Sequence, residues 1–413
     1  MEGAHLWVGA TDVTAVGSAG PAARSSPRPD ATAASVEPGP PAGRGAGVGW
    51  ALRVSLLPWV LARILVAIAL AVAHERAASG RLSTAALSRV HQGLLGWDAG
   101  WYEAIARHGY AGAGHASLRF FPVFPLLSRA LAVLPGVGVG AALVVLSNAC
   151  ALAGTAVVVV LVRRESGDER LAGRAAWLLC LAPPAFTFVM GYAEGTLLVL
   201  SAGAFSALRA RRWWWAAGLG VLAGLTRPLG ALLVLPAVVE LSRGWRSAPA
   251  QERVGRLAAA AGPVVGTGAF LGWVGWRYGD ALAPLRLQEQ GAHHGWADPF
   301  VTLAHDASSL VHGHHLGEGL HLPWVLLAVA LLVVALRRWP ASYGLFAAGV
   351  LAVALTGSNL DSFERYALSA FPLVLAAATT VTRSKRVWPV VVVGSAAAMV
   401  AYAVLAFTNV YVP

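Results

Sequence analysis

Apolar runs close to the length of a membrane-spanning helix recur along the chain from position 54 to position 408. A helix needs about 20 mostly apolar residues to cross the hydrocarbon layer, and it satisfies its own backbone hydrogen bonds there. Only 12% of the 413 residues are charged, whereas about 25% is usual for a soluble domain. The sequence therefore predicts an all-α, polytopic membrane helical bundle and excludes a soluble enzyme.

The predicted bundle has roughly nine spanning helices and a re-entrant helical hairpin. The spans are expected at 54–74, 138–162, 171–190, 193–208, 257–276, 321–336, 341–357, 363–382 and 388–408. The hairpin is expected at 214–241, because Pro228 breaks the helix near its middle and arginines stand on both sides of it. Broken membrane helices occur where they line a cavity.

The remaining segments predict the domain organisation and the orientation. Residues 1–50 are rich in Ala, Pro, Gly and Ser, which predicts a disordered cytoplasmic tail. Residues 51–413 are expected to form one integral membrane domain with two long outer loops, 75–136 and 277–320. The net charge of +11 reflects arginines in short loops between apolar runs, the pattern of cytoplasmic loops. It indicates a multi-pass protein of the cell membrane with a cytoplasmic N-terminus, and no nucleic-acid partner.

The first outer loop combines a carboxylate with aromatic residues at helical spacing. A helix ended by Gly109 puts Asp98 and Tyr102 on one face, with Trp97 and Trp101 nearby. Tryptophans anchor such a helix at the membrane interface, so Asp98 is expected where a lipid-linked substrate presents its sugar. The alternative is that Asp98 is only an acid favoured by the dipole at a helix start.

Three arginines stand at or near membrane depth: Arg63 in the first span, Arg227 in the hairpin and Arg365 near the start of the span at 363–382. An arginine at the bilayer centre costs roughly 2.5–3.5 kcal/mol on insertion scales unless it is paired or hydrated. Three of them suggest an anionic partner such as a lipid phosphate, which guanidinium binds well. Internal pairing with acids such as Glu194 or Asp361 is the alternative.

Two further features bear on chemistry. Glu194 is expected at an outer turn, where it either stabilises the start of a helix or faces the same outer cavity as Asp98. The histidines at 312, 314, 315 and 321 are irregularly spaced and no cysteine joins them, so a solvated loop is favoured over a metal site. Neither a metal nor another cofactor is expected.

Several motifs, in this order, resemble the PIG-V mannosyltransferase family and its bacterial relatives. Trp97-Asp98-Ala-Gly-Trp101-Tyr102 is the most specific of them. The weaker ones are Phe120-Phe121-Pro122, Gly167-Asp168-Glu169-Arg170, Leu181-Ala182-Pro183, Gly191-Tyr192-Ala193-Glu194, Leu225-Thr226-Arg227-Pro228 and Arg365-Tyr366. The match covers residues 54–385. Ala193, Gly195 and Leu229 depart from the Thr, Ser and Thr that family members often have there.

The resemblance implies the GT-C architecture, with an active site on the outer face, and inverting transfer of mannose from a polyprenyl-phosphate donor. In that scheme Asp98 is the general base that takes the proton of the acceptor hydroxyl, and the arginines stabilise the departing lipid phosphate. The expected substrate-binding residues are Trp97, Trp101, Tyr102, Glu194, Arg63, Arg227, Arg365 and Tyr366. The expected partners are a polyprenyl-phosphate-sugar donor, a glycan or lipid acceptor, and membrane lipids.

Two other classes remain open at this stage. A lipid-linked sugar flippase, or another multispan transporter, would also place arginines at membrane depth. Transporters usually show repeated halves and small interfacial loops, whereas here the predicted outer loops are long and no repeat is found. A catalytically silent membrane scaffold is the third interpretation, because of the departures at Ala193 and Gly195. The motifs favour the glycosyltransferase.

Overall fold

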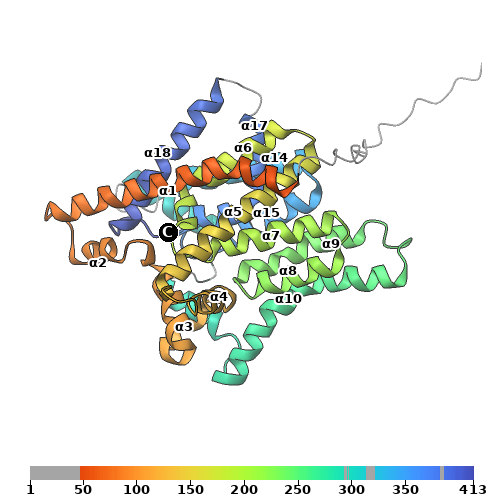
Figure 1. Ribbon diagram of the computed structural model, residues 1–413, viewed down its shortest axis with the longest axis horizontal. Helices are drawn as coiled ribbons and strands as arrows, with labels where there is room; N and C mark the ends of the chain where they lie inside the picture. The colour runs from red at the N-terminus through yellow and green to blue at the C-terminus, as the bar shows by residue number, and fades with distance from the viewer. Residues whose placement is uncertain (1–46, 293–294, 296, 313–320, 382–385) are drawn as a thin grey trace, which may run out of the picture. The chain divides into compact units, whose positions relative to one another are not determined.

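The computed structural model describes residues 47–292, 295, 297–312, 321–381 and 386–413, and these residues form helices joined by turns, with no strand among them (Figure 1). The prediction of an all-α fold is confirmed. Residues 1–46 of the predicted tail at 1–50 and part of the predicted loop at 277–320 lie outside the described residues, as do His314 and His315, whereas residues 48–50 belong to the first helix.

Four helices of the described part are long and apolar enough to cross a membrane, and each of them coincides with a predicted span. They are α1 (Val48–Ala78), α5 (Val139–Ser166), α10 (Ala250–Tyr278) and α18 (Val387–Phe407). The remaining helices are shorter, and the count of roughly nine spans stays a prediction. Their bounds are α2 (Thr84–Gln92), α3 (Asp98–Ala113), α4 (Val123–Leu131), α6 (Glu169–Leu181), α7 (Glu194–Arg209), α8 (Trp213–Gly224), α9 (Val234–Ser242), α11 (Ala283–Ala292), α12 (Pro299–His312), α14 (Leu322–Arg338), α15 (Ala341–Leu355), α16 (Phe363–Ser369) and α17 (Phe371–Val381).

Two predicted spans are broken helices. The segment 171–190 continues from α6 into the 3₁₀ helix η3 (Pro183–Phe188), because two successive prolines cannot continue an α-helix. The segment 363–382 is divided at Ala370 into α16 and α17. Two further 3₁₀ turns, η1 (Gly93–Leu95) and η2 (His115–Arg119), flank α3.

The segment predicted as a hairpin, 214–241, contains α8, the 3₁₀ helix η4 (Pro228–Leu233) and α9. The chain leaves α8 at Thr226 and is extended at Arg227, with φ −157° and ψ 154°. The break therefore lies where the sequence places it, because Pro228 cannot sit inside an α-helix. A membrane-embedded, re-entrant path for this segment stays a prediction.

Helix α8 lies against α10, and α7 and α9 flank the pair (Figure 1). Gly220 and Gly224 of α8 face Pro263 of α10, and a methyl group on either glycine would collide with that residue. Gly262 of α10 faces the backbone of α8 in the same way. Small residues four positions apart let membrane helices approach closely. This crossing fixes the end of α8, from which Arg227 projects.

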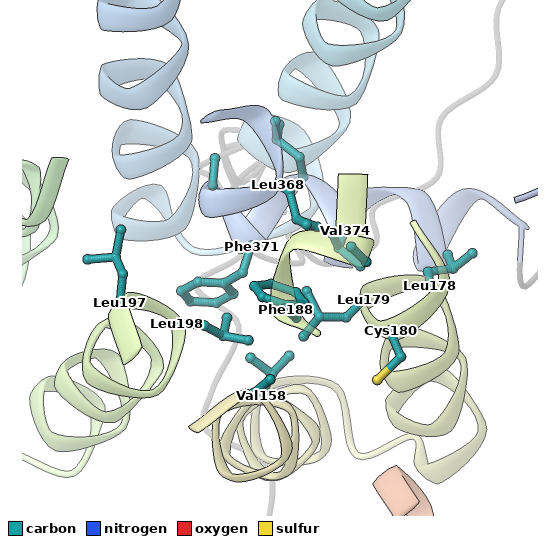
Figure 2. Packing of buried hydrophobic residues seen from close by; sticks show 14 of the residues in the cluster. Val158, Leu178, Leu179, Cys180, Phe188, Leu197, Leu198, Leu368, Phe371 and Val374 are labelled. Atoms are coloured by element: carbon teal, nitrogen blue, oxygen red, sulfur yellow. The ribbon is translucent and has the colours of Figure 1, made fainter. Parts of the chain in front are cut away.

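The main apolar core lies between α5, α6, η3, α7, α16 and α17, as Figure 2 shows. Val158 of α5, Leu198 of α7 and Phe371 of α17 meet around Phe188 of η3. Helices α7 and α16 thereby become one packed unit, although their sequences are about 170 positions apart. Each of these two helices carries an ionised residue of the site described below.

A second, polar cluster joins the other ends of the helices. Arg209, at the end of α7, donates to Glu165 of α5 across 2.6 Å and to Glu240 of α9 across 3.3 Å. The Ser342 hydroxyl, in the first turn of α15, donates to Glu240 across 2.9 Å. Since Glu194 begins α7 and Arg209 ends it, the two ends of α7 are about 22 Å apart. The cluster closes one end of the bundle and leaves the opposite end to the site.

Candidate active site

Asp98 is the first residue of α3, and a strained backbone presents it. Trp97, immediately before it, has φ +58°, a region that side chains other than glycine rarely adopt. The Trp97 indole Nε1–H donates to the Ala406 carbonyl of α18 across 3.0 Å, and the Asp98 backbone N–H donates to the Tyr192 hydroxyl across 3.3 Å. Such strain persists only where the surroundings hold it, and it gathers at functional sites.

Arg365, on α16, is the direct partner of Asp98. Its Nη1 donates to Asp98 Oδ2 across 2.6 Å, a charge-assisted hydrogen bond. Helix α16 starts at Ser362, which also has a positive φ of +64°, and the Ser362 hydroxyl donates to the Pro413 carbonyl across 2.7 Å. The Arg365 side chain is 7% exposed and that of Asp98 29%, so the carboxylate keeps access to its surroundings.

A second ion pair lies beside the first. Arg227 donates to Glu194 Oε1, and Arg365 Nη1 lies 3.4 Å from the same oxygen. Both guanidinium groups lie over the Tyr366 ring, with 5.6 Å from Arg227 and 5.7 Å from Arg365 to its centroid. Two acids and two arginines therefore form one four-residue cluster with no net formal charge, which we call the charge cluster.

The charge cluster forms part of the wall of a cavity of about 620 Å³, a size typical of ligand sites. The rest of the wall is of three kinds. The aromatic side is formed by Trp97, Trp101, Tyr102, Phe120 and Phe121, and the apolar side by Leu229, Leu232, Leu285, Val353 and Ala354. The polar side chains are those of Arg89, Arg119, Gln288, Glu289, Asn359 and Asp361.

The cavity brings together most of the residues singled out in the sequence. Those on its wall are Trp97, Asp98, Trp101, Tyr102, Arg227, Arg365 and Tyr366. Glu194 lies behind the wall, 3% exposed, where it touches both arginines. Internal pairing of Arg227 and Arg365, the alternative weighed from the sequence, is thus present, although the partner of Arg365 is chiefly Asp98.

Arg63 is not brought to the cavity. Its Nε donates to Asn148 Oδ1 across 2.7 Å, and its two other nitrogens donate to the backbone carbonyls of Trp59 and Phe188. Its guanidinium also stacks on the Trp59 ring, with 4.2 Å to the centroid. These contacts join α1 to α5 and to the end of η3.

Two arginines on the cavity wall, Arg89 and Arg119, were not singled out from the sequence. Each stacks on a tryptophan that neighbours Asp98: Arg89 lies 4.1 Å from the Trp97 ring centroid and Arg119 lies 5.4 Å from that of Trp101. Arg119 directly precedes the Phe120-Phe121-Pro122 motif, and this position is the feature of the sequence that could have identified it as a site residue.

The charges around Asp98 set its protonation. Burial by itself raises the pKa of the Asp98 carboxyl, but Arg365, with help from Arg227 and Arg119, holds that pKa below its ordinary value. The carboxylate is therefore ionised at neutral pH. An ionised carboxylate accepts hydrogen bonds and can accept a proton from a hydroxyl that is losing it to a new bond.

Gly195 explains how Glu194 reaches the cluster. It lies against the Ser147 carbonyl of α5, and a methyl group there would collide with that backbone. Helices α5 and α7 can approach this closely only because position 195 carries no side chain. Glu103, also on α3, does not line the cavity and pairs with Arg107 across 2.6 Å.

The histidine predicted to lie in a solvated loop, His321, is buried, and its Nδ1 lies 2.8 Å from Glu364 Oε1. That expectation is wrong for His321, because the residue stands at the start of α14 and packs beside α16. The side chain of His312 lies outside the described part of the chain.

The described part of the chain thus has four helices long enough to cross a membrane, and a cavity lined by a carboxylate, arginines and aromatic rings. Such a lining is suited to a ligand with polar groups. The family model of Glycosyltransferase family 87 matches residues 121–360, more than half of the chain, and the chain belongs to that family. The match supports a membrane glycosyltransferase family, not the PIG-V family specifically. No curated protein matches the chain.

The matched residues include Glu194 and Arg227, whereas Asp98 precedes them and Arg365 follows them. The charge cluster thus combines two residues inside the family match with two outside it.

Proposed function

We propose that the protein transfers mannose, with inversion, from a polyprenyl-phosphate donor to an acceptor hydroxyl at the outer membrane face, with Asp98 as the general base. The observation that carries this proposal is the 2.6 Å contact between Asp98 and Arg365 on the wall of an aromatic-lined cavity. The family match supports sugar transfer as the reaction. The resemblance of the Trp97–Tyr102 motif to mannosyltransferases supports the sugar and the donor.

The reaction is a single displacement. The acceptor oxygen forms a bond to the anomeric carbon while its proton passes to an Asp98 carboxylate oxygen. The bond between that carbon and the phosphate oxygen breaks, and its electron pair stays on the leaving polyprenyl phosphate. Arg365 stabilises the negative charge that develops there. One displacement inverts the configuration at the anomeric carbon.

Donor binding also prepares the base. Without donor, Arg365 is bound to Asp98, which lowers the basicity of the carboxylate. A donor phosphate competes for the same guanidinium and so leaves Asp98 free to accept the acceptor proton. Glu194, 3.4 Å from Arg365, keeps a charge partner beside the arginine during this exchange.

The walls of the cavity suit the parts of such a donor. The aromatic side offers flat faces on which a sugar ring packs, and the apolar side, formed by η4, α11 and α15, suits an isoprenoid chain.

The position of the cavity on the outer face of the membrane is supported by the distribution of charge. Arg209, Arg211 and Arg212 follow the end of α7, opposite to the end at which Glu194 lies, and basic loops are cytoplasmic.

Sugar transfer is tested with the purified protein in lipid nanodiscs, labelled polyprenyl-phosphate-mannose and a lipid extract of the host, with products identified by mass. Asp98→Asn removes the base and should abolish product when equal amounts of folded protein are compared. Glu103→Gln is the matched control on the same helix, because Glu103 pairs with Arg107 and does not line the cavity. Full transfer by Asp98→Asn would contradict the role of Asp98. Movement of intact donor across the bilayer without product would identify a flippase instead.

A further inference from the structure

The charge cluster by itself is poorly suited to capture a phosphate. Asp98 and Glu194 already neutralise Arg365 and Arg227. The phosphodiester of a lipid-linked sugar carries one negative charge, and the phosphate released after transfer carries more. An additional cation on the cavity wall, free of acidic partners, would supply the missing charge.

Arg119 meets this requirement. It ends η2, and its guanidinium rests on two rings, 5.4 Å from the Trp101 centroid and 5.0 Å from the Phe120 centroid. Within the described part of the chain, its side chain makes no ion pair or hydrogen bond, and its Nε–H is buried without an acceptor. A buried donor without a partner is costly, and a ligand that accepts from it recovers that free energy.

The backbone holds Arg119 in place. The Tyr110 hydroxyl donates to the Phe120 carbonyl across 2.7 Å, directly after Arg119 in the chain. The Trp101 and Phe120 rings are themselves stacked, with centroids 5.9 Å apart. The guanidinium therefore lies on a preformed aromatic support, which limits the entropy lost when it binds an anion.

Arg89 provides the contrast. It stacks on Trp97 in the same cavity, but its Nε donates to Asn409 Oδ1 across 3.3 Å and its Nη1 donates to Gln92 Oε1 across 2.9 Å. Two of its three nitrogens thus donate to neutral partners within the protein. The two arginines have the same charge and the same kind of aromatic contact, but only Arg119 has a buried Nε–H without an acceptor.

We propose that Arg119 is the principal binding residue for the phosphate of the lipid-linked donor, and that Arg365 joins it only when the phosphate displaces Asp98. This inference rests on the proposed function. It assigns capture of the donor to Arg119 and stabilisation of the leaving group to Arg365. A planar guanidinium with free N–H groups binds phosphate oxygens through charge-assisted hydrogen bonds.

The test measures binding of citronellyl phosphate to the purified protein in nanodiscs by tryptophan fluorescence, beside citronellol and inorganic phosphate. The wild type should bind citronellyl phosphate more tightly than either of the other two. Arg119→Gln should weaken binding of citronellyl phosphate by about 10- to 100-fold, the value of a lost charge-assisted hydrogen bond. Binding of citronellol should stay unchanged. Arg119→Lys, which keeps the charge, should recover part of the loss.

Arg89→Gln is the matched control and should change binding less than threefold, because Arg89 already donates to Asn409 and Gln92 and has no buried donor without an acceptor. Equal losses in the Arg89 and Arg119 variants would overturn the assignment, because they would show a general effect of cavity charge. An unchanged affinity in Arg119→Gln, together with a large loss in Arg365→Gln, would overturn it and leave the proposed function standing. A wild type that binds citronellyl phosphate no better than citronellol would contradict the proposed function itself. If inorganic phosphate bound more tightly than citronellyl phosphate, the assignment would be overturned, and the ligand of Arg119 would be a free phosphate instead of the phosphate of a lipid.

Discussion

Arg365 donates to Asp98 across 2.6 Å, although the two residues are 267 positions apart in the chain. The bond joins the start of α3 to α16, and Glu194 extends the contact to Arg227. An ion pair that is largely removed from water adds little net stability, but loss of one partner leaves the other charge uncompensated. The pair is therefore suited to a binding site in which a charged ligand replaces one of its two members.

Removal of one member of this pair should be more harmful than removal of both. Arg365→Gln should lower the free energy of unfolding by about 2–5 kcal/mol, because Asp98 is left without its main partner. The double variant with Asp98→Asn should regain part of this loss. Thermal unfolding in detergent, analysed as a double-mutant cycle, measures the coupling. The exposed pair of Glu103 and Arg107 is the control, with a coupling of about 0–1 kcal/mol. Strict additivity at Asp98 and Arg365 would contradict the arrangement.

The contribution of Asp98 to stability should depend on pH. Because its native pKa lies below its value in the unfolded chain, which is about 3.9, the ionised form stabilises the folded state. That contribution is fully present above the unfolded pKa and is lost as pH falls through the native pKa. The stability advantage of the wild type over Asp98→Asn should thus be constant from pH 5 to pH 8 and shrink in more acidic solution. Unfolding curves at several pH values test this, and an advantage that grows on acidification would refute it.

The contact of Gly195 with α5 should be essential for the position of Glu194. Gly195→Ala adds a methyl group against the Ser147 carbonyl, so α7 must move away from α5. We expect a loss of stability of about 1–3 kcal/mol, as for other overpacked sites, and a fall in sugar transfer. Gly268→Ala is the control, since a methyl group on that glycine of α10 meets open space. Equal stability and activity of the two variants would show that the α5–α7 crossing tolerates the added volume.

The bond between Trp97 and the last long helix should influence turnover more than donor affinity. Trp97→Phe keeps an aromatic ring but removes the N–H that donates to the Ala406 carbonyl. A lost hydrogen bond of this type is worth about 0.5–1.5 kcal/mol. Because it orients the residue next to the base, we expect a lower kcat with a nearly unchanged KM for the donor. Trp276→Phe, at a side chain that is 82% exposed, is the control. A change confined to KM would show that Trp97 acts by binding substrate.

The sequence predicted those parts of the site that depend on residues close together in the chain. The spacing of Asp98 and Trp101 predicted a helix, and Pro228 predicted the break beside Arg227; the structure has both features, whereas the position of the helix at the membrane surface stays a prediction. Helical spacing does not report contacts between distant segments, so the direct bond between Asp98 and Arg365 was not foreseen. Arg63 shows the limit most clearly. An arginine in an apolar helix looks the same in a sequence whether it faces an anion or, as here, an asparagine and backbone carbonyls.

Some differences in the fold had visible signals. The adjacent Pro183 and Pro184 interrupt the predicted span at 171–190, and the rule that prolines end helices would have placed η3 there. The division at Ala370 precedes Pro372 and follows from the same rule. Arg119 had only its position before the Phe120-Phe121-Pro122 motif as a signal, because its role in the site depends on making no ion pair, which three-dimensional packing decides.

The sequence separation within the charge cluster has a consequence for how the protein is made. Glu194 and Arg227 are 33 positions apart and can neutralise each other while the nascent chain is still short. Arg365, the partner of Asp98, is synthesised 267 residues after it, which takes about 13–53 s at the usual speed of a ribosome. During this interval the carboxylate lacks the arginine that donates a hydrogen bond to it, so folding intermediates should keep α3 near water until α16 emerges. Biosynthesis therefore completes the reactive pair late, when only α17 and α18 remain to be synthesised.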